Sequence, residues 1–115
     1  MKHPESDLQK ACKRWFDYQH GHLAKMCFCV PNGGFRNFKE ASRMKAEGVV
    51  AGASDIILLV GRNGYNALCI ELKAEKGRQT DLQREWQEVA EKYGNKYIIV
   101  RSLEDFINEV NNYLK

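Results

Sequence analysis

The sequence predicts an α/β protein in which helices flank a mixed four-stranded sheet. Short apolar runs, typical of strands, alternate along the chain with segments whose apolar residues recur at helical spacing. An Asn63-Gly64 pair between two apolar runs indicates an antiparallel hairpin, whereas the helical segment before the last run is long enough for a parallel crossover. A helix, three strands, a helix, a strand and a final helix are therefore expected in that order.

Start and stop signals place the individual elements. The first helix is expected to begin near Pro4, a favoured first-turn residue, and to end near Gly21. A short helix from about residue 37 to residue 47 should follow the first strand and end at Gly48. The expected strands are residues 25–30, 54–60, 67–73 and 96–100, and the remaining helices are residues 80–94 and the segment that starts at residue 102.

Apolar spacing also predicts which face of the crossover helix is buried. Its buried stripe is expected to consist of Leu82, Trp86, Val89, Ala90 and Tyr93. At the start of this helix, Thr80 and Gln83 have the spacing of a capping box, in which each side chain accepts a hydrogen bond from the backbone amide of the other residue.

The composition is that of a globular domain, with 43% hydrophobic and 29% charged residues among 115. We expect one domain over residues 1–115, because a chain of this length can bury one core. The net charge of +3 permits an anionic partner without requiring one. No apolar run is long enough to span a bilayer and the N-terminus is charged rather than signal-like, which favours a soluble, cytoplasmic protein. The four cysteines are expected to be buried free thiols: Cys12, Cys27, Cys29 and Cys69.

An acidic and a basic residue stand two positions apart at the end of an apolar strand. Glu71 and Lys73 therefore share one face of the strand over residues 67–73. Asp55 opens the preceding strand, and in an antiparallel hairpin the start of one strand lies beside the end of the next. Asp55 should then meet Glu71 and Lys73. Two carboxylates and a lysine together indicate a divalent metal site with a catalytic amine.

The hairpin turn sets a condition on this hypothesis. A two-residue Asn63-Gly64 turn followed by unbroken pairing would place Asp55 opposite Leu72 and send its side chain to the other face. A three- or five-residue loop, or one bulge, would pair Asp55 with Glu71 instead. The metal-site hypothesis requires the second arrangement.

A glycine-containing loop and a basic helical face form a second candidate site. The loop after the first strand offers unobstructed backbone amides, and basic residues recur at spacings of three and four on the short helix that follows. A plain turn and a solvated basic face are the alternatives. Their proximity favours contact with DNA phosphates, for which the candidates are Asn32, Gly33, Gly34, Arg36, Lys39 and Arg43.

The order of elements and residues resembles the VRR-NUC family, the small virus-type replication-repair nuclease domains of the PD-(D/E)XK superfamily. The resemblance runs from about Glu5 to Val100 and implies a restriction-endonuclease-like core. It rests on Glu5, Asn32-Gly33, Gly48-x-x-x-Gly52-x-x-Asp55, Glu71-Leu72-Lys73, Gly77 and Gln83. The family usually has proline before the aspartate, where this chain has Ser54. Proline supplies no metal ligand, so the departure concerns the backbone rather than the chemistry.

The resemblance implies a role for each matching residue. Mg²⁺ or Mn²⁺ would be held by Asp55, Glu71, the backbone carbonyl of Leu72 and, through a metal-bound water, Glu5. The helix dipole is an alternative explanation for Glu5, since it favours a carboxylate in the first turn. Lys73 would act on the attacking water, either as its base or as an electrostatic clamp. Gln83 would orient Lys73 or the nucleophile. Its alternative is a helix cap alone, because a side chain folded back onto the Thr80 amide is not expected to reach the site as well.

The expected function is hydrolysis of DNA by a metal-dependent endonuclease. The resemblance implies branched DNA as substrate, including four-way junctions, a homodimeric enzyme, and a place in DNA repair or recombination, including that of phages and prophages. Candidate dimer contacts are Tyr18, Phe35 and Phe38. Two alternatives stay open: a catalytically silent DNA-binding or assembly module, and a nuclease subunit that needs a partner protein for substrate choice.

Overall fold

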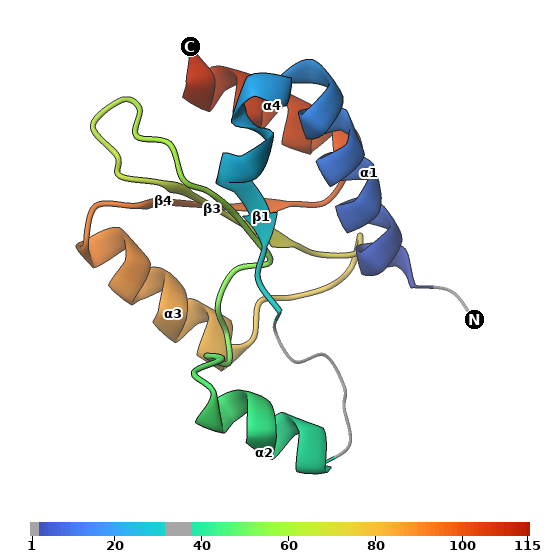
Figure 1. The fold of residues 1–115 in the computed structure, drawn as a ribbon, viewed down its shortest axis with the longest axis vertical. Helices are drawn as coiled ribbons and strands as arrows, with labels where there is room; N and C mark the ends of the chain where they lie inside the picture. Colours follow the sequence, from blue (N-terminus) through green and yellow to red (C-terminus); the bar gives the residue numbers. More distant parts are fainter. Residues whose placement is uncertain (1–2, 32–37) are drawn as a thin grey trace.

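A mixed sheet lies at the centre of the protein, with helices on both of its faces (Figure 1). The computed structural model describes residues 3–31 and 38–115, and within them the sheet has four strands in the spatial order β1-β2-β3-β4. The strands are β1 (Cys27–Cys29), β2 (Ile56–Leu58), β3 (Leu68–Leu72) and β4 (Lys96–Val100). The pairs β1–β2 and β2–β3 are antiparallel and the pair β3–β4 is parallel. The predicted fold class is therefore confirmed.

The helices form layers on the two faces of this sheet. They are α1 (Pro4–Gln19), the 3₁₀ helix η1 (Gly21–Met26), α2 (Phe38–Ala46), α3 (Asp81–Lys92) and α4 (Leu103–Leu114). Figure 1 shows α1 and α4 together on one face and α3 on the other. The helix η1 replaces the start of the strand predicted from residue 25, because apolar content alone does not separate a strand from a short 3₁₀ connector. In the described residues no helix is long and apolar enough to cross a membrane.

Alternation along β3 assigns its side chains to two different cores. Leu68, Ile70 and Leu72 pack into the main core with residues of α1 and α4. Cys69 lies on the opposite face, in a smaller core under α3. Every residue of β3 is buried, including Glu71, so the predicted alternation places a carboxylate on the α3 face of a fully covered strand.

The stripe predicted for α3 is wrong in part. Ala90 is buried and Trp86 is half-buried, but Leu82, Val89 and Tyr93 are 54%, 56% and 67% exposed. The helix packs against β4 and reaches the sheet through a narrow contact with Cys69 and Tyr97. Residues on either side of that contact stay in solvent, because the helical period shows which residues share a face but not how much of the face is covered.

The cysteines are free thiols, as predicted. Cys12, Cys27 and Cys69 are buried, whereas Cys29 is only half-buried at the end of β1. Burial raises the pKa of Cys12 and of Cys27 to about 12 and that of Cys69 to about 11. These thiols are therefore packing residues at neutral pH, since a thiol reacts as its thiolate.

The hairpin between β2 and β3 has the tight turn that the sequence predicts. Arg62 and Tyr65 exchange backbone hydrogen bonds across it. Asn63 has a φ of 54° and Gly64 a φ of 84°, so both central residues adopt the left-handed conformation of a type I′ turn.

Beyond this turn, the pairing of β2 with β3 is shifted by one residue from the pairing that the turn alone would give. Unbroken pairing from the turn would place Ile56 opposite Glu71, but Ile56 pairs with Ile70. Residues 59–61 on the β2 side, three in number, face residues 66–67, two in number, on the β3 side. Continuing the observed pairing by one residue brings Asp55 opposite Glu71, so the chain meets the condition for the metal-site hypothesis through a bulge-like offset.

Candidate active site

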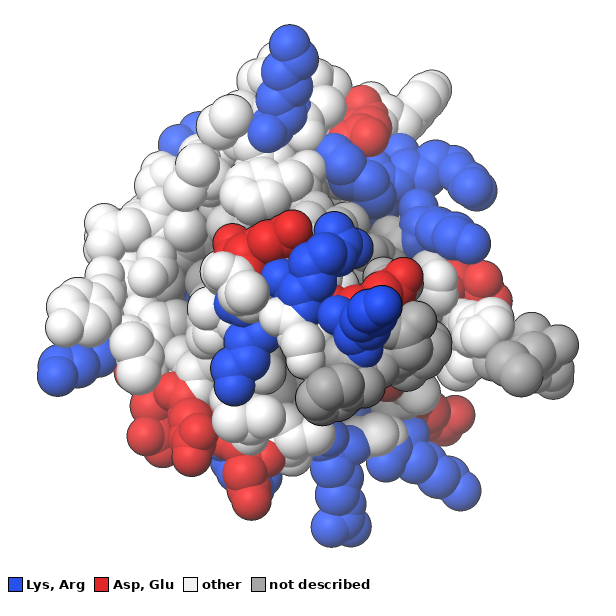
Figure 2. All heavy atoms as spheres, turned by 60° about the horizontal axis from the view of Figure 1, so that its bottom comes forward, with Lys and Arg blue, Asp and Glu red and all other residues white. Residues whose placement is uncertain are grey.

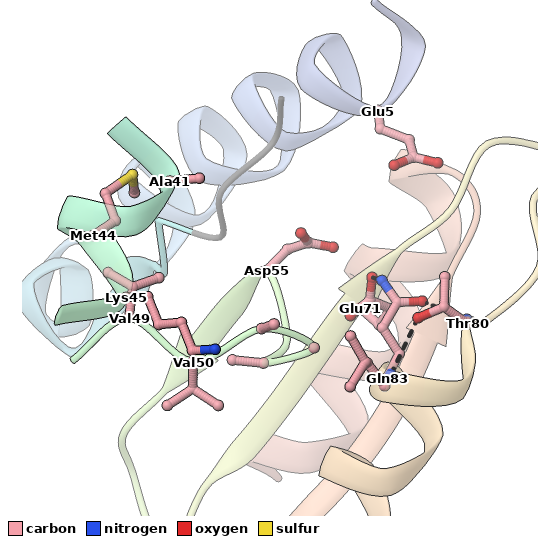
Figure 3. A pocket seen from close by; sticks show the side chains of 14 residues that line it. Glu5, Ala41, Met44, Lys45, Val49, Val50, Asp55, Glu71, Thr80 and Gln83 are labelled. Carbon is pink, nitrogen blue, oxygen red and sulfur yellow. Dashed lines mark hydrogen bonds between the residues drawn. The ribbon is translucent and has the colours of Figure 1, made fainter. Parts of the chain in front are cut away.

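Asp55 and Glu71 lie side by side at the end of the β2–β3 pair. Asp55 directly precedes β2, and its Oδ2 atom accepts a hydrogen bond of 2.7 Å from the backbone N–H of Leu72. Glu71 is 1% exposed. Both line a pocket of about 760 Å³, into which Glu5 of α1 and Gln83 of α3 also project (Figure 3). The rest of the lining is largely apolar and comes from α2, residues 49–53 and Leu82.

Glycine and serine residues shape the backbone that leads to Asp55. A Cβ atom on Gly52 would stand 2.5 Å from the backbone oxygen of Leu82, and the residue has a φ of +91°. The loop before β2 can therefore approach the first turn of α3 only because position 52 is glycine. Ser54 is fully buried and its hydroxyl donates to the backbone oxygen of Ile56 at 3.3 Å, at the position where the family usually has proline.

The electrostatics of the acidic pair suit a divalent cation. Burial, and then the adjacent Asp55 carboxylate, raise the pKa of Glu71 to about 8, against the opposite influence of Lys73 and Tyr97. When both are ionised, the half-buried Asp55 and the buried Glu71 repel each other, and a hard cation with oxygen ligands relieves that repulsion. Among residues 3–31 and 38–115, no group of three or more His, Cys, Asp and Glu side chains is placed to hold a metal. The adjacent carboxylates of Asp55 and Glu71 supply oxygen donors of the kind that such a cation prefers, and the Leu72 carbonyl as a further donor stays a prediction.

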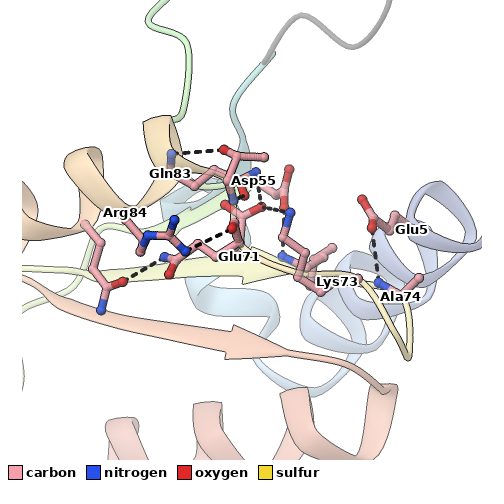
Figure 4. A network of polar contacts seen from close by, with 12 residues as sticks. Glu5, Asp55, Glu71, Lys73, Ala74, Gln83 and Arg84 are labelled. Atoms are coloured by element: carbon pink, nitrogen blue, oxygen red, sulfur yellow. Dashed lines mark hydrogen bonds and ion pairs between the residues drawn. The ribbon is translucent and has the colours of Figure 1, made fainter.

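Lys73 lies within reach of this pair. Its Nζ atom is 3.9 Å from Oε2 of Glu71 and its side chain is almost fully buried (Figure 4). Its backbone N–H donates to the carbonyl of Val100 at 3.0 Å, which continues the parallel pairing beyond the end of β3. The predicted strand geometry thus brings Lys73 beside the Glu71 carboxylate.

Gln83 takes part in the cap and in the site at the same time. Its Oε1 atom accepts from the Thr80 N–H at 2.8 Å, and its own N–H donates to the Thr80 hydroxyl at 3.2 Å, which completes the predicted capping box. Its Nε2 atom donates to Oε2 of Glu71 at 2.9 Å. The expectation that one contact excludes the other is wrong, because the amide accepts with its oxygen and donates with its nitrogen.

Glu5 approaches the site from α1. Its Oε2 atom accepts a hydrogen bond of 3.1 Å from the backbone N–H of Ala74, the residue after Lys73 (Figure 4). Glu5 therefore ties the start of α1 to the segment that carries the lysine, and it lines the same pocket as the acidic pair. Its role as a metal ligand stays a prediction.

Two polar residues that the sequence reasoning missed complete the surroundings of Glu71. The hydroxyl of Tyr97 on β4 donates to Oε1 of Glu71 at 3.4 Å. The Nε2 atom of Gln79 donates to the same hydroxyl at 3.2 Å. Tyr97 pairs with Cys69 in the sheet, two residues before Glu71. The alternation of residues 96–100 indicates which of their side chains share a face of the sheet. It does not show which residue of β3 lies beside Tyr97, because the helix between two parallel strands leaves their register open.

The predicted phosphate-binding face is described only in part. Lys39 and Arg43 are exposed on α2, and Arg43 forms an exposed ion pair of 3.5 Å with Glu47. Figure 2 shows Lys and Arg side chains gathered at the centre of the face that holds α2 in Figure 1. Arg36 and the predicted loop residues Asn32, Gly33 and Gly34 lie outside the described residues.

A lysine and two carboxylates gathered where neighbouring strands of a mixed α/β sheet begin and end are the arrangement expected of a PD-(D/E)XK nuclease. The family model of the VRR-NUC domain matches residues 1–103. The chain belongs to the VRR-NUC family, and it is accordingly a nuclease domain of the PD-(D/E)XK type.

The comparison with solved structures supports the fold. A chain described as a VRR_NUC domain protein has a TM-score of 0.83 and 24% sequence identity, over 99% of this chain and 90% of that one. The search of curated proteins finds no match.

Proposed function

We propose that the protein is a Mg²⁺- or Mn²⁺-dependent DNA endonuclease whose metal is held by Asp55, Glu71 and the backbone carbonyl of Leu72. The observation that supports this most strongly is the pairing of the buried Glu71 with the half-buried Asp55, with the Lys73 amine 3.9 Å from Glu71. When bound, a divalent ion supplies positive charge to the phosphate and lowers the pKa of a coordinated water.

The chain's own residues prepare the site for hydrolysis. Lys73 lies where it can orient the attacking water or accept its proton. Gln83 holds Oε2 of Glu71 from the α3 side. Glu5 holds the Ala74 amide and so restrains the segment that follows Lys73.

Branched DNA is the substrate class that we propose, with four-way junctions included. A domain of 115 residues has little surface for reading base sequence, which favours recognition of DNA shape. The basic face of α2, with Lys39 and Arg43, stands beside the pocket and offers phosphate contacts, to which Arg36 and the loop Asn32, Gly33 and Gly34 would add.

The experiment that tests the proposal is cleavage of matched linear, flap and four-way DNA substrates with Mg²⁺, with Mn²⁺ and with chelator. Each substrate should carry the same sequences, so that only branching differs. We expect metal-dependent cuts and faster cutting of the branched substrates. Cleavage in chelator would contradict the metal site, and equal rates on all substrates would contradict shape selectivity.

We further propose that the enzyme acts as a homodimer. The part of the chain that the structure describes has one such acidic pair, and a four-way junction presents two equivalent strands, so paired incision requires a second copy. Tyr18 is 89% exposed on α1 and is a candidate contact, whereas Phe35 and the side chain of Phe38 lie outside the described residues. Sedimentation equilibrium over a micromolar range, alone and with junction DNA, tests this. A monomer under both conditions would contradict it.

A further inference from the structure

Tyr97 lies in the second layer around the acidic pair and is 7% exposed. Its ring packs on Trp86 of α3, with ring centroids 6.2 Å apart. This packing holds the hydroxyl under α3, where it reaches Oε1 of Glu71 at 3.4 Å. The ring is thus fixed by the small core, while its one polar atom points to the carboxylate.

A chain of hydrogen bonds sets the direction in which this hydroxyl donates. The Glu91 carboxylate can only accept, so Gln87 presents its Nε2 atom to Glu91 at 3.3 Å and leaves its Oε1 atom for Gln79. Gln79 then presents its Nε2 atom, which donates to Gln87 at 2.7 Å and to the Tyr97 oxygen at 3.2 Å. The amide nitrogen has two hydrogens and uses both.

These hydrogen bonds determine which donors the two oxygens of Glu71 have. Since the Tyr97 oxygen already accepts from Gln79, its hydrogen is available for Oε1 of Glu71. The other oxygen, Oε2, accepts from Gln83, whose amide is oriented by the cap at Thr80. Each oxygen of this carboxylate therefore has one donor of defined direction.

We propose that Tyr97, oriented by Gln79, is a positioning residue that fixes the Glu71 carboxylate for metal binding. This inference rests on the proposed function, since it requires that Glu71 is a metal ligand. Outer hydrogen bonds of this kind hold a ligand in its binding orientation, and their loss typically costs about 10- to 100-fold in metal affinity.

The first test compares two tyrosines that each lose one hydroxyl. Tyr113 is the matched control, because it is 2% exposed and its hydroxyl donates to the Val60 carbonyl at 2.7 Å, outside the site. Calorimetric titration with Mn²⁺ should show about a 10-fold weaker affinity for Tyr97→Phe and an unchanged affinity for Tyr113→Phe. Thermal unfolding establishes that both variants are folded.

The second test reverses the direction in which the Tyr97 hydroxyl donates its hydrogen bond. Gln79→Glu keeps the side-chain length but offers an acceptor, to which Tyr97 would donate instead of to Glu71. A new negative charge near the site strengthens cation binding by itself, whereas loss of orientation weakens it. A weaker Mn²⁺ affinity therefore supports the inference, and an equal or stronger affinity overturns it.

The wild-type protein separates the two possible failures. If it binds Mn²⁺ and cuts DNA while Tyr97→Phe binds Mn²⁺ equally well, the positioning role is overturned and the proposed function stands. If the wild-type protein does not bind Mn²⁺, both are overturned.

Discussion

The Asp55 carboxylate accepts a hydrogen bond of 2.7 Å from the backbone N–H of Leu72 and so crosses from the start of β2 to the end of β3. This contact holds Asp55 beside Glu71. It also places Asp55 against the residue whose backbone carbonyl we propose as the third metal donor. The predictions below test this arrangement.

Asp55→Asn and Glu71→Gln should each abolish DNA cleavage and leave the fold intact. Each change removes one negative ligand at nearly constant volume, and we expect a loss of more than about 100-fold, since even residues in the outer layer of a metal site contribute about 10- to 100-fold. Rates with Mg²⁺ and circular dichroism spectra measure the two effects. Asp7→Asn, at an exposed position of α1, is the control. Cleavage at the wild-type rate by either variant would mean that the site is elsewhere.

Lys73→Ala should lose cleavage and keep metal binding. The amine lies 3.9 Å from Glu71 and competes with a cation for the same carboxylate, so the Mn²⁺ affinity should be equal to or higher than that of the wild type. The rate should fall by about 10²- to 10⁴-fold, the usual range for a positioned acid or base. Calorimetry measures the Mn²⁺ affinity, and single-turnover cleavage measures the rate. A variant that no longer binds Mn²⁺ would contradict the role assigned to Lys73.

Gln83→Glu should separate the cap from the site. Glutamate is also a capping-box residue, so the bond to the Thr80 amide should be kept. The side chain can no longer donate to Glu71, and cleavage should fall by about 10-fold or more. Thr80→Ala provides the reverse control, with a stability loss of about 0.5–2 kcal/mol. Full activity of Gln83→Glu would restrict Gln83 to the cap.

A triple alanine variant of Arg36, Lys39 and Arg43 should weaken DNA binding and reduce its salt dependence. Each lost phosphate contact should lower the slope of log affinity against log salt by about 0.9. Fluorescence anisotropy at several salt concentrations measures the slope. An unchanged slope would show that these side chains form only a solvated basic face.

The pH dependence of stability should report the buried Glu71. Burial and the Asp55 carboxylate raise its pKa from 4.5 to about 8, so between these values the folded, metal-free protein holds a proton that the unfolded chain has lost. Stability should therefore fall as the pH rises from about 4.5 to 8. Glu71→Gln has no such proton, so its stability relative to that of the wild type should rise between pH 5 and pH 8. Urea unfolding in chelator at pH 5 and pH 8 measures this, with the exposed Glu88→Gln as control. A difference in stability between Glu71→Gln and the wild type that is the same at both pH values would contradict this prediction.

Much of the fold was predictable because its signals are local. The two-residue period of a strand places Glu71 on the α3 face, and the Asn63-Gly64 pair gives the turn. The offset between turn and strands was not predictable, since the same turn fits either pairing. Tyr97 was missed because a helical crossover leaves the register of parallel strands undetermined. The prediction that Gln83 could not both cap α3 and reach the site was wrong because the amide oxygen and the amide nitrogen were treated as one group.

The one-residue offset in the hairpin couples the active site to the opposite side of the sheet. Ile56 and Leu58 are fully buried in the main core, next to α1 and α4. If the pairing moved into step with the turn, Asp55 would leave the Glu71 face and both apolar side chains would leave the core. Exposing each would cost about 1.5–3 kcal/mol. The burial of Ile56 and Leu58 on the other face of the sheet thus keeps the two carboxylates together, although neither side chain belongs to the site.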